Sequence, residues 1–266
     1  DINLKLMKEV QSLTHITCSS LQGLEKEFRE FPPQIVLSQG DTTTAFSAAL
    51  AAFYQSIPVG HIEAGLRTNQ INDPFPEEAN RRLISQLSTI NYAPTQQSAE
   101  NLKSSGICGE IEITGNTVID ALFLIAKKKR NPPTKKIDWI NHQVLFATIH
   151  RRENWGNRIK DISNGLLKII NSYPNTSLLL PMHPNSKVRE PIMNILGNHP
   201  RIELTEPLAY DELVSCITRS KLILTDSGGL QEEAPSLGKP VLILRETTER
   251  MEALAAGTAK LIGTNS

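Results

Sequence analysis

The sequence is poor in cysteine, with only Cys18, Cys108 and Cys216 among its 266 residues. These three residues are far apart and odd in number, so they form neither a disulfide framework nor the paired spacing of a zinc site. Free thiols of this kind fit a reducing compartment, and we expect a cytoplasmic protein. We also expect all three side chains to be buried or half-buried.

The sequence also lacks an excess of charge of either sign and any long apolar run. Lys and Arg together number 28, as do Asp and Glu, so the formal net charge is zero with neutral histidine. A balanced charge argues against nucleic acid as the main partner. No apolar run approaches the length that spans a membrane, and no signal-peptide pattern is present, so we predict no membrane association.

Several motifs of common enzymes are missing. The sequence has no His-Glu-x-x-His, no paired Cys-x-x-Cys and no acidic triplet, and we therefore predict no metal site. No Gly-x-Gly-x-x-Gly or Walker-type loop supports the binding of NAD or ATP. The absence of Gly-x-Ser-x-Gly disfavours the usual serine hydrolases.

What the sequence does contain is a regular alternation of short apolar runs and helical patterns. We predict strands near residues 35–37, 57–62, 91–93, 111–113, 144–149, 178–180, 202–204, 221–224 and 241–244. We predict helices at residues 1–30, 44–54, from 76, at 96–105, 118–129, 159–171, 210–219 and 234–238. This order predicts an α/β protein of two Rossmann-like domains with parallel sheets, residues 1–116 and 117–266.

A basic run that contains two prolines, residues 127–136, is the clearest change of composition. Such a run is typical of a solvated helix end followed by a linker. A nucleic-acid patch is the weaker interpretation, since no aromatic residues alternate with the charges.

The most informative stretch is a strand, a Ser-Gly-Gly turn and a helix at residues 221–238. This arrangement directs free backbone N–H groups beyond the strand end, and glycine allows an anion to approach them closely. We interpret it as a nucleotide diphosphate site, with Ser227 and Gly228 on phosphate and Glu233 on ribose. The alternative is an ordinary helix start with Ser227 as the N-cap.

Other polar residues also follow predicted strands, at the sheet edge where α/β proteins bind ligands. They are Asp41, Glu63, His150, His183, Asp226 and Arg245. Structural alternatives remain for most: Asp41 as a helix cap, Glu77 paired with Arg81, and each histidine as a structural residue. Four arginines suit phosphate or pair with nearby glutamates, namely Arg151, Arg152, Arg245 and Arg250.

Seven polar motifs follow the predicted strands, at residues 40–44, 61–68, 76–81, 114–122, 150–154, 226–235 and 245–250. Together and in this order they resemble the bacterial UDP-N-acetylglucosamine 2-epimerases over essentially the whole chain. The form of residues 61–68, His-Ile-Glu-Ala-Gly-Leu-Arg-Thr, is similar to the non-hydrolysing branch. Hydrolysing relatives typically carry a sequence that starts with Gly-Gly after the glutamate.

The resemblance implies a GT-B-like fold with the active site in the cleft between the two domains. It implies reversible conversion of UDP-GlcNAc to UDP-ManNAc, by elimination of UDP to 2-acetamidoglucal and re-addition, without a metal or redox cofactor. This reaction feeds cell-surface polysaccharide synthesis. The matching positions are catalytic Asp41, Glu63, Glu77 and His150, and substrate-binding His183, Ser227, Gly228, Glu233 and Arg151.

The resemblance further implies a homodimer and a second UDP-GlcNAc that acts as an allosteric activator, with Arg67 as a candidate contact. The family's first strand and its C-terminal helix have no counterpart here, so we expect a chain truncated at both ends that is unstable or inactive alone. The alternatives are a hydrolysing 2-epimerase, a GT-B glycosyltransferase, and an inactive fragment that only binds the UDP-sugar.

Overall fold

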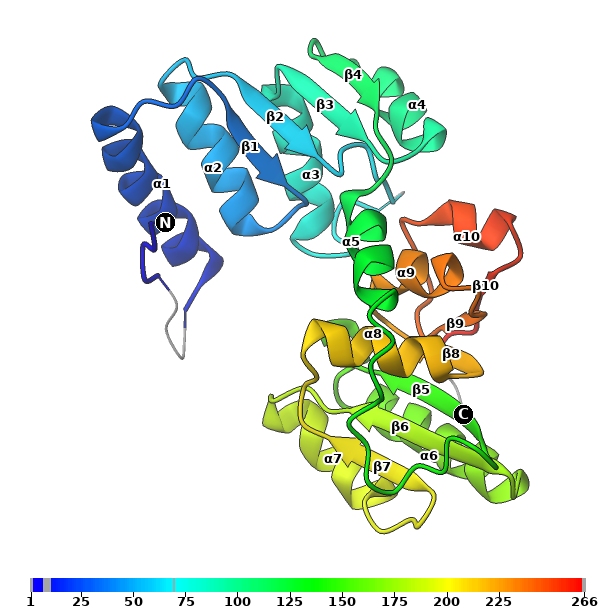
Figure 1. Cartoon of the computed structure of the whole chain (residues 1–266). Coiled ribbons are helices and arrows are strands. Elements are labelled where there is room, and N and C mark those ends of the chain that lie inside the picture. Colours follow the sequence, from blue (N-terminus) through cyan, green and yellow to red (C-terminus); the bar gives the residue numbers. More distant parts are fainter. Residues whose placement is uncertain (1, 7–10, 69, 265–266) are drawn as a thin grey trace. The chain divides into compact units, whose positions relative to one another are not determined.

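The computed structural model describes residues 2–6, 11–68 and 70–264. The chain divides into two compact units, Asp1–Asn116 and Thr117–Ser266, which we call unit 1 and unit 2 (Figure 1). Each unit has its own parallel sheet, so the predicted α/β class is confirmed. None of the described helices is both long enough and apolar enough to cross a membrane.

Unit 1 contains, within its described residues, a four-stranded parallel sheet in the order β1-β2-β3-β4. Its elements are α1 (Leu13–Glu30), β1 (Val36–Gln39), α2 (Thr43–Tyr54), β2 (Val59–Ile62), α3 (Glu77–Leu87), β3 (Ile90–Ala93), α4 (Gln96–Ser104) and β4 (Glu110–Ile113). Buried alanines of α2, Ala45, Ala49 and Ala52, recur at helical spacing and pack with Val59 and Ile84. The alternating pattern therefore predicted these strands to within two residues at most boundaries.

The first predicted helix is shorter than expected. α1 begins at Leu13, and the hydroxyl of Ser12 caps it by accepting a hydrogen bond from the backbone N–H of His15 at 3.1 Å. Residues 2–6 form no helix, and the remainder of the predicted segment before Gln11 lies outside the described residues. Ser12 therefore marks the start of α1, and the apolar periodicity predicted this start about a dozen residues too early.

Unit 2 contains, within its described residues, a six-stranded parallel sheet in the order β10-β9-β8-β5-β6-β7. Its elements are α5 (Thr117–Ala126), β5 (Gln143–Thr148), the 3-10 turn η1 (Arg152–Asn154), α6 (Asn157–Ser172), β6 (Thr176–Pro181), α7 (Ser186–Leu196), β7 (Ile202–Thr205), α8 (Tyr210–Arg219), β8 (Leu222–Thr225), α9 (Leu230–Ser236), β9 (Val241–Ile243), α10 (Met251–Ala255) and β10 (Ala259–Leu261). The chain runs from β5 outward to β6 and β7, then returns to β8 on the other side of β5. The strand order therefore reverses between β5 and β8, which opens a crevice beyond their carboxyl ends.

The linker predicted at residues 127–136 ends where its backbone is hydrogen-bonded to a buried carboxylate of unit 2. The buried carboxylate of Glu203 in β7 accepts backbone N–H groups from Lys135 at 2.8 Å, Lys136 at 2.7 Å and Ile137 at 3.2 Å. Trp139 follows, and its indole N–H donates to the Thr134 hydroxyl at 2.7 Å. The solvated linker therefore stops at Lys135, where the main chain becomes fixed.

We expect Glu203→Gln to lower the free energy of unfolding of unit 2 by about 2 kcal/mol, because an amide nitrogen replaces an oxygen that accepts buried N–H groups. Urea unfolding followed by tryptophan fluorescence measures the effect. The matched control is Glu206→Gln, at an exposed position where Arg189 is the partner, and it is expected to leave the midpoint unchanged. Equal midpoints for both variants would contradict the anchor.

The prediction of buried thiols is wrong for two of the three cysteines. Cys18 on α1 and Cys108 in the loop before β4 are exposed, whereas Cys216 on α8 is buried. Burial raises the pKa of the Cys216 thiol to about 12. Cys18 lies on the solvent-facing side of a helix and Cys108 in a loop. Neither position is marked by an apolar pattern in the sequence, so the exposure of these two residues could not be predicted.

Candidate active site

A buried carboxylate organises the crevice between β5 and β8. Asp226, directly after β8, accepts the backbone N–H of His150 at 3.0 Å and of Arg151 at 2.9 Å. It also accepts the side-chain amide of Asn154 at 2.9 Å and lies 2.9 Å from Nδ1 of His150. These contacts fix the loop that follows β5 and hold the imidazole with Nδ1 toward Asp226. The opposite ring nitrogen, Nε2, is then the atom suited to proton transfer.

Asp226 is ionised in this environment. Burial alone opposes ionisation of a carboxyl group, but the hydrogen bonds from His150 and from the backbone N–H of Arg151 outweigh it. The pKa of Asp226 is therefore lower than its ordinary value. An anion behind His150 stabilises an imidazolium ring, as a carboxylate does in other acid/base pairs.

His183 lies in the same crevice, after β6. A hollow of about 240 Å³ at the carboxyl ends of β5 and β6 is lined by His150, His183, Pro184, Pro207 and Leu208, among others. Nδ1 of His183 accepts the backbone N–H of Asn185 at 3.1 Å. Partial burial, and then the charge of His150, lower the pKa of His183, so its ring is neutral at pH 7. The structure thus brings both predicted histidines to one hollow of unit 2.

The Ser-Gly-Gly turn does not use serine as a helix cap, which corrects the structural alternative for Ser227. α9 begins at Leu230 with Gly229 as its N-cap, and the backbone N–H of Ser227 donates to the Thr225 hydroxyl at 2.9 Å. A Cβ atom at Gly228 would lie 2.9 Å from side-chain atoms of both Glu249 and Arg250. A side chain at 228 would therefore force this ion pair to shift.

Glu233 is buried on α9 and has a partner that the sequence did not reveal. The hydroxyl of Tyr210, the first residue of α8, donates to Glu233 Oε1 at 2.8 Å. Burial raises the pKa of Glu233, and burial together with this contact raises the pKa of Tyr210. Tyr210 comes from a different helix, so no sequence spacing relates it to Glu233.

Two of the four arginines considered for phosphate binding take the ion-pair alternative. Arg245 is fully buried between Glu153 at 2.9 Å and Glu249 at 3.1 Å. Arg250 contacts Glu249 at 2.5 Å and also pairs with Glu232. These guanidinium groups brace the loop after β9. Arg151 contributes its backbone N–H to Asp226, as described above.

In unit 1 the predicted site residues also follow strands. Asp41 comes after β1, and its carboxylate accepts from Arg81 Nη2 at 2.5 Å and Nε at 3.1 Å. It is not the cap of α2, because the hydroxyl of Thr42 accepts the backbone N–H of Ala45. Glu63 follows β2 with a left-handed φ of 65°, and Glu77 is the first residue of α3.

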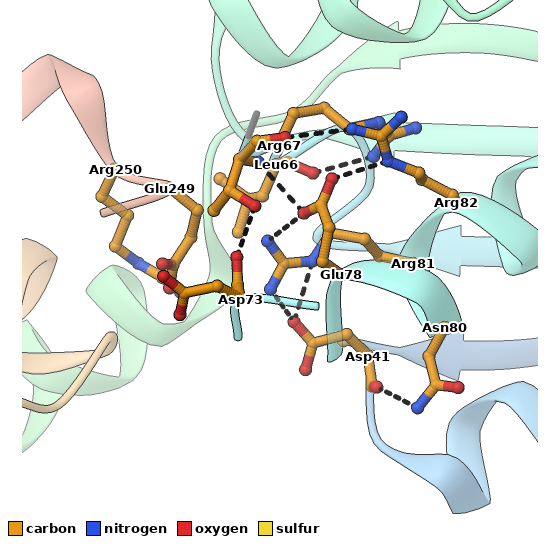
Figure 2. A network of polar contacts seen from close by, with 12 residues as sticks. Asp41, Leu66, Arg67, Asp73, Glu78, Asn80, Arg81, Arg82, Glu249 and Arg250 are labelled. Carbon is orange, nitrogen blue, oxygen red and sulfur yellow. Dashed lines mark hydrogen bonds and ion pairs between the residues drawn. The ribbon is translucent and has the colours of Figure 1, made fainter. Parts of the chain in front are cut away.

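Arg67 and His61 are packed within unit 1. Arg67 donates to the carbonyl oxygen of Leu66 at 2.8 Å and to the Ser85 hydroxyl at 3.3 Å, and burial lowers its pKa to about 10 (Figure 2). His61 lies 2.9 Å from the carbonyl oxygen of Gly40, and burial lowers its pKa to about 4. His61 is therefore neutral at pH 7 and ties β2 to the loop that carries Asp41.

Sequence reasoning missed the residues that support the site from other elements. They are Glu78 and Asn80 in unit 1, and Thr148, Asn154 and Tyr210 in unit 2. Among the described residues, no group of three or more His, Cys, Asp or Glu side chains is arranged to hold a metal ion.

Two parallel-sheet units of this kind place the chain in the GT-B-like class of α/β proteins. The fold alone is shared with an α,α-trehalose 6-phosphate synthase from Burkholderia multivorans, which is 10% identical with a TM-score of 0.61 over 96% of this chain and 66% of that chain.

Relatives at high identity define the family more narrowly. The family model described as UDP-N-acetylglucosamine 2-epimerase matches residues 1–266. A UDP-N-acetylglucosamine 2-epimerase from Neisseria meningitidis serogroup A is 49% identical over 274 residues, covering 100% of this chain and 74% of that protein. The crystal structure of UDP-GlcNAc 2-epimerase from Neisseria meningitidis bound to UDP-GlcNAc matches with a TM-score of 0.94 and 49% identity, over 100% of this chain and 74% of that chain. The chain therefore belongs to the UDP-N-acetylglucosamine 2-epimerase family, and the predicted resemblance is confirmed.

Proposed function

We propose that the chain carries the machinery for reversible epimerisation of UDP-GlcNAc to UDP-ManNAc at C2. The observation that carries the proposal is the family match over the whole chain, together with a relative that binds UDP-GlcNAc. The reaction inverts a carbon that bears a hydrogen of low acidity, so it needs groups that remove and return a proton and a stabilised leaving group.

The proposed reaction has two steps. In the first, a base takes the C2 proton, the C2–H electron pair forms the C1=C2 double bond of 2-acetamidoglucal, and the C1–O bond breaks to release UDP. In the second, a UDP oxygen attacks C1 and a proton is delivered to the opposite face of C2. The reaction needs no net oxidation, and proton transfers on the two faces call for more than one acid/base group.

The proposed acid/base groups are Asp41, Glu63 and Glu77 in unit 1 and His150 in unit 2. Support for His150 comes from its contact with Asp226, which holds Nδ1 and leaves Nε2 as the ring nitrogen for proton transfer. Asp41 is supported by its ion pair with Arg81, which fixes the direction of the carboxylate.

The proposed UDP contacts lie in unit 2. They are His183, Ser227, Gly228, Glu233 and Arg151. The hollow lined by His150 and His183 supports them. The non-hydrolysing course rests on the form of residues 61–68. The predicted homodimer, cytoplasmic location and role in polysaccharide synthesis stay predictions of the family resemblance, as does the activator UDP-GlcNAc near Arg67.

Proton NMR of UDP-GlcNAc with the protein in D₂O tests the proposed function. The chain spans 74% of the length of the Neisseria relative, so the measurement is also made with the chain extended to that length. Appearance of UDP-ManNAc with deuterium at C2 in the extended protein is the expected result. Free ManNAc with UDP would indicate the hydrolysing reaction. Binding of UDP without turnover by the chain alone would identify a nucleotide-binding fragment, and absence of turnover in the extended protein would reject the epimerase proposal.

We expect Glu233→Gln to raise the Kd for UDP roughly tenfold or more, because a charged hydrogen bond to the ribose hydroxyls contributes about 1.5–3 kcal/mol. Isothermal titration calorimetry with UDP measures the affinity. Glu206→Gln, the same change at an exposed position of unit 2, is the control and is expected to leave Kd unchanged. An unchanged Kd in a folded Glu233→Gln protein would remove Glu233 from the nucleotide site.

A further inference from the structure

Arg81 is a buried guanidinium shared by two carboxylates. Its Nε and Nη2 donate to Oδ2 of Asp41 at 3.1 and 2.5 Å, and its Nη1 donates to Oε2 of Glu78 at 3.2 Å (Figure 2). The side chains of Arg81 and Glu78 are 3% and 0% exposed, whereas that of Asp41 is 26% exposed. Asp41 therefore faces outward from a network that is closed behind it.

Glu78 is the fixed point of this network. Besides Arg81, its carboxylate accepts the backbone N–H of Thr68 at 3.0 Å and Nε of Arg82 at 2.7 Å (Figure 2). Three donors thus meet on one carboxylate with no solvent access, and two of them are cationic. Arg81 cannot rotate away from Asp41 without leaving a buried charge short of its partner, which is strongly unfavourable.

The main chain around Asp41 is held as firmly as its carboxylate. The side-chain amide of Asn80 donates to the carbonyl oxygen of Asp41 at 2.9 Å. The backbone N–H of Gly40 donates to the carbonyl oxygen of Ile62 at 3.0 Å. Neighbouring residues of α3, Asn80 and Arg81, therefore hold the backbone and the side chain of Asp41 at the same time (Figure 2). Rigid support of this kind is what a proton-transfer group requires.

We propose that Glu78 is a positioning residue that acts through Arg81 to orient the carboxylate of Asp41. The inference rests on the proposed function, in which Asp41 exchanges the C2 proton. Glu78 touches neither Asp41 nor any reacting atom in this role. Its contribution is to fix the guanidinium of Arg81, which contacts Asp41 directly.

The geometry of the Arg81 guanidinium gives the proposal a distinctive signature. Its Nε and Nη2 hold Asp41 while its Nη1 holds Glu78, so the direction of the Asp41 carboxylate depends on the planar fork and on the Glu78 anchor behind it. Arg81→Lys keeps the positive charge and loses the fork, and Glu78→Gln keeps the fork and weakens its anchor. If the network acts through Asp41, neither substitution lowers kcat further once Asp41 itself is replaced. A merely structural role would lower kcat by the same factor in both backgrounds.

The test is a double-mutant cycle measured by steady-state kinetics, with the wild type and Asp41→Asn as the two backgrounds. Glu78→Gln and Arg81→Lys are made in each background, and far-UV circular dichroism checks that every variant is folded. A second readout, at one fixed pH, is the ¹³C signal of the Asp41 side-chain carboxyl, assigned with Asp41→Asn, which is expected to move in both variants. The controls Arg189→Met and Glu206→Gln, in an exposed ion pair, leave kcat, KM and the Asp41 signal unchanged.

The expected result differs between the two backgrounds. We expect Glu78→Gln and Arg81→Lys to lower kcat about 10²-fold in the wild type with little change in KM, as misplacement of a reacting group does. In Asp41→Asn they are expected to lower kcat no further. Equal losses in both backgrounds, or an unmoved Asp41 signal in folded variants, would overturn the inference. If Arg81→Lys does not fold, the cycle with Glu78→Gln makes the comparison. Absence of C2 exchange in the wild type would overturn the proposed function instead, and the carbon signal, which does not depend on turnover, would still test the inference.

Discussion

Replacement of Asp226 by asparagine is expected to slow epimerisation by about 10²–10⁴-fold. One side of the carboxylate, Oδ2, accepts from three groups: the backbone N–H of His150 and of Arg151 and the amide of Asn154. The NH₂ group of an asparagine would therefore turn to the other side, where it faces Nδ1 of His150. The imidazole must then accept at Nδ1, and its proton moves to Nε2, which can no longer act as a base.

The same substitution is expected to lower the stability of unit 2. Removal of a buried charge that its neighbours are arranged to bind costs about 3 kcal/mol. The folded-state pKa of Asp226 is depressed, so its contribution is present above the ordinary pKa of aspartate, about 3.9, and is lost as the pH falls through the folded value. The difference in stability between wild type and Asp226→Asn should therefore shrink in acid.

Steady-state kinetics, and urea unfolding at several pH values, measure both effects. The matched control is Asp138→Asn: Asp138 is exposed and accepts from the backbone N–H of Ile140 and Asn141 and from the side chain of Asn141. That control repeats the chemical change without a histidine partner and is expected to keep full activity. Wild-type rates in Asp226→Asn would show that the tautomer of His150 has no role in catalysis.

The second large effect is expected at Gly65, in the loop that also carries Glu63. Its φ is +91°, and a Cβ atom there would lie 2.2 Å from the carbonyl oxygen of Ser98 and 2.9 Å from the side chain of Leu102. Alanine adds backbone strain of about 1–3 kcal/mol and an overlap that costs a similar amount. We expect Gly65→Ala to destabilise unit 1 by roughly 2–6 kcal/mol.

Gly106→Ala is the matched control, because it isolates the clash from the backbone conformation. Gly106 has a φ of +65°, and nothing lies within 4 Å of its Cβ position. It should lose only about 1 kcal/mol, the cost of the left-handed conformation. Urea unfolding followed by far-UV circular dichroism compares the two. Equal losses would mean that the loop moves away from Ser98 at little cost.

The sequence predicted most of the fold because buried strands and amphipathic helices leave a periodic record. Three elements were not predicted. α7 has buried residues at helical spacing, Val188, Ile192 and Leu196, but it contains Pro191 in its interior, a residue that normally ends a helix. α10 and β10 have 5 and 3 residues, too few to establish a period.

The site was predictable where it lies at strand ends and unpredictable where it depends on packing. Asp41, His150 and His183 each lie two residues beyond the end of a strand, so the pattern was sufficient to single them out. Tyr210 contacts Glu233 from a different helix, and no local spacing encodes that contact. Glu78 pairs with Arg81 at i,i+3 on α3, but the contact of Arg81 with Asp41 joins two elements and left no local record. The N-cap assignment of Ser227 failed for a related reason, because the two glycines delay the start of the helix by two further residues.

The two units differ in the residues that can serve as spectroscopic probes. Both tryptophans of the chain, Trp139 and Trp155, belong to unit 2, whereas the exposed thiols Cys18 and Cys108 belong to unit 1. Tryptophan emission therefore reports on unit 2 alone, and a maleimide dye reacts with unit 1 while the buried Cys216 stays unmodified. With either exposed cysteine replaced by serine, energy transfer from tryptophan to the dye on the remaining cysteine measures the distance between the units, and it can follow their separation as UDP is titrated.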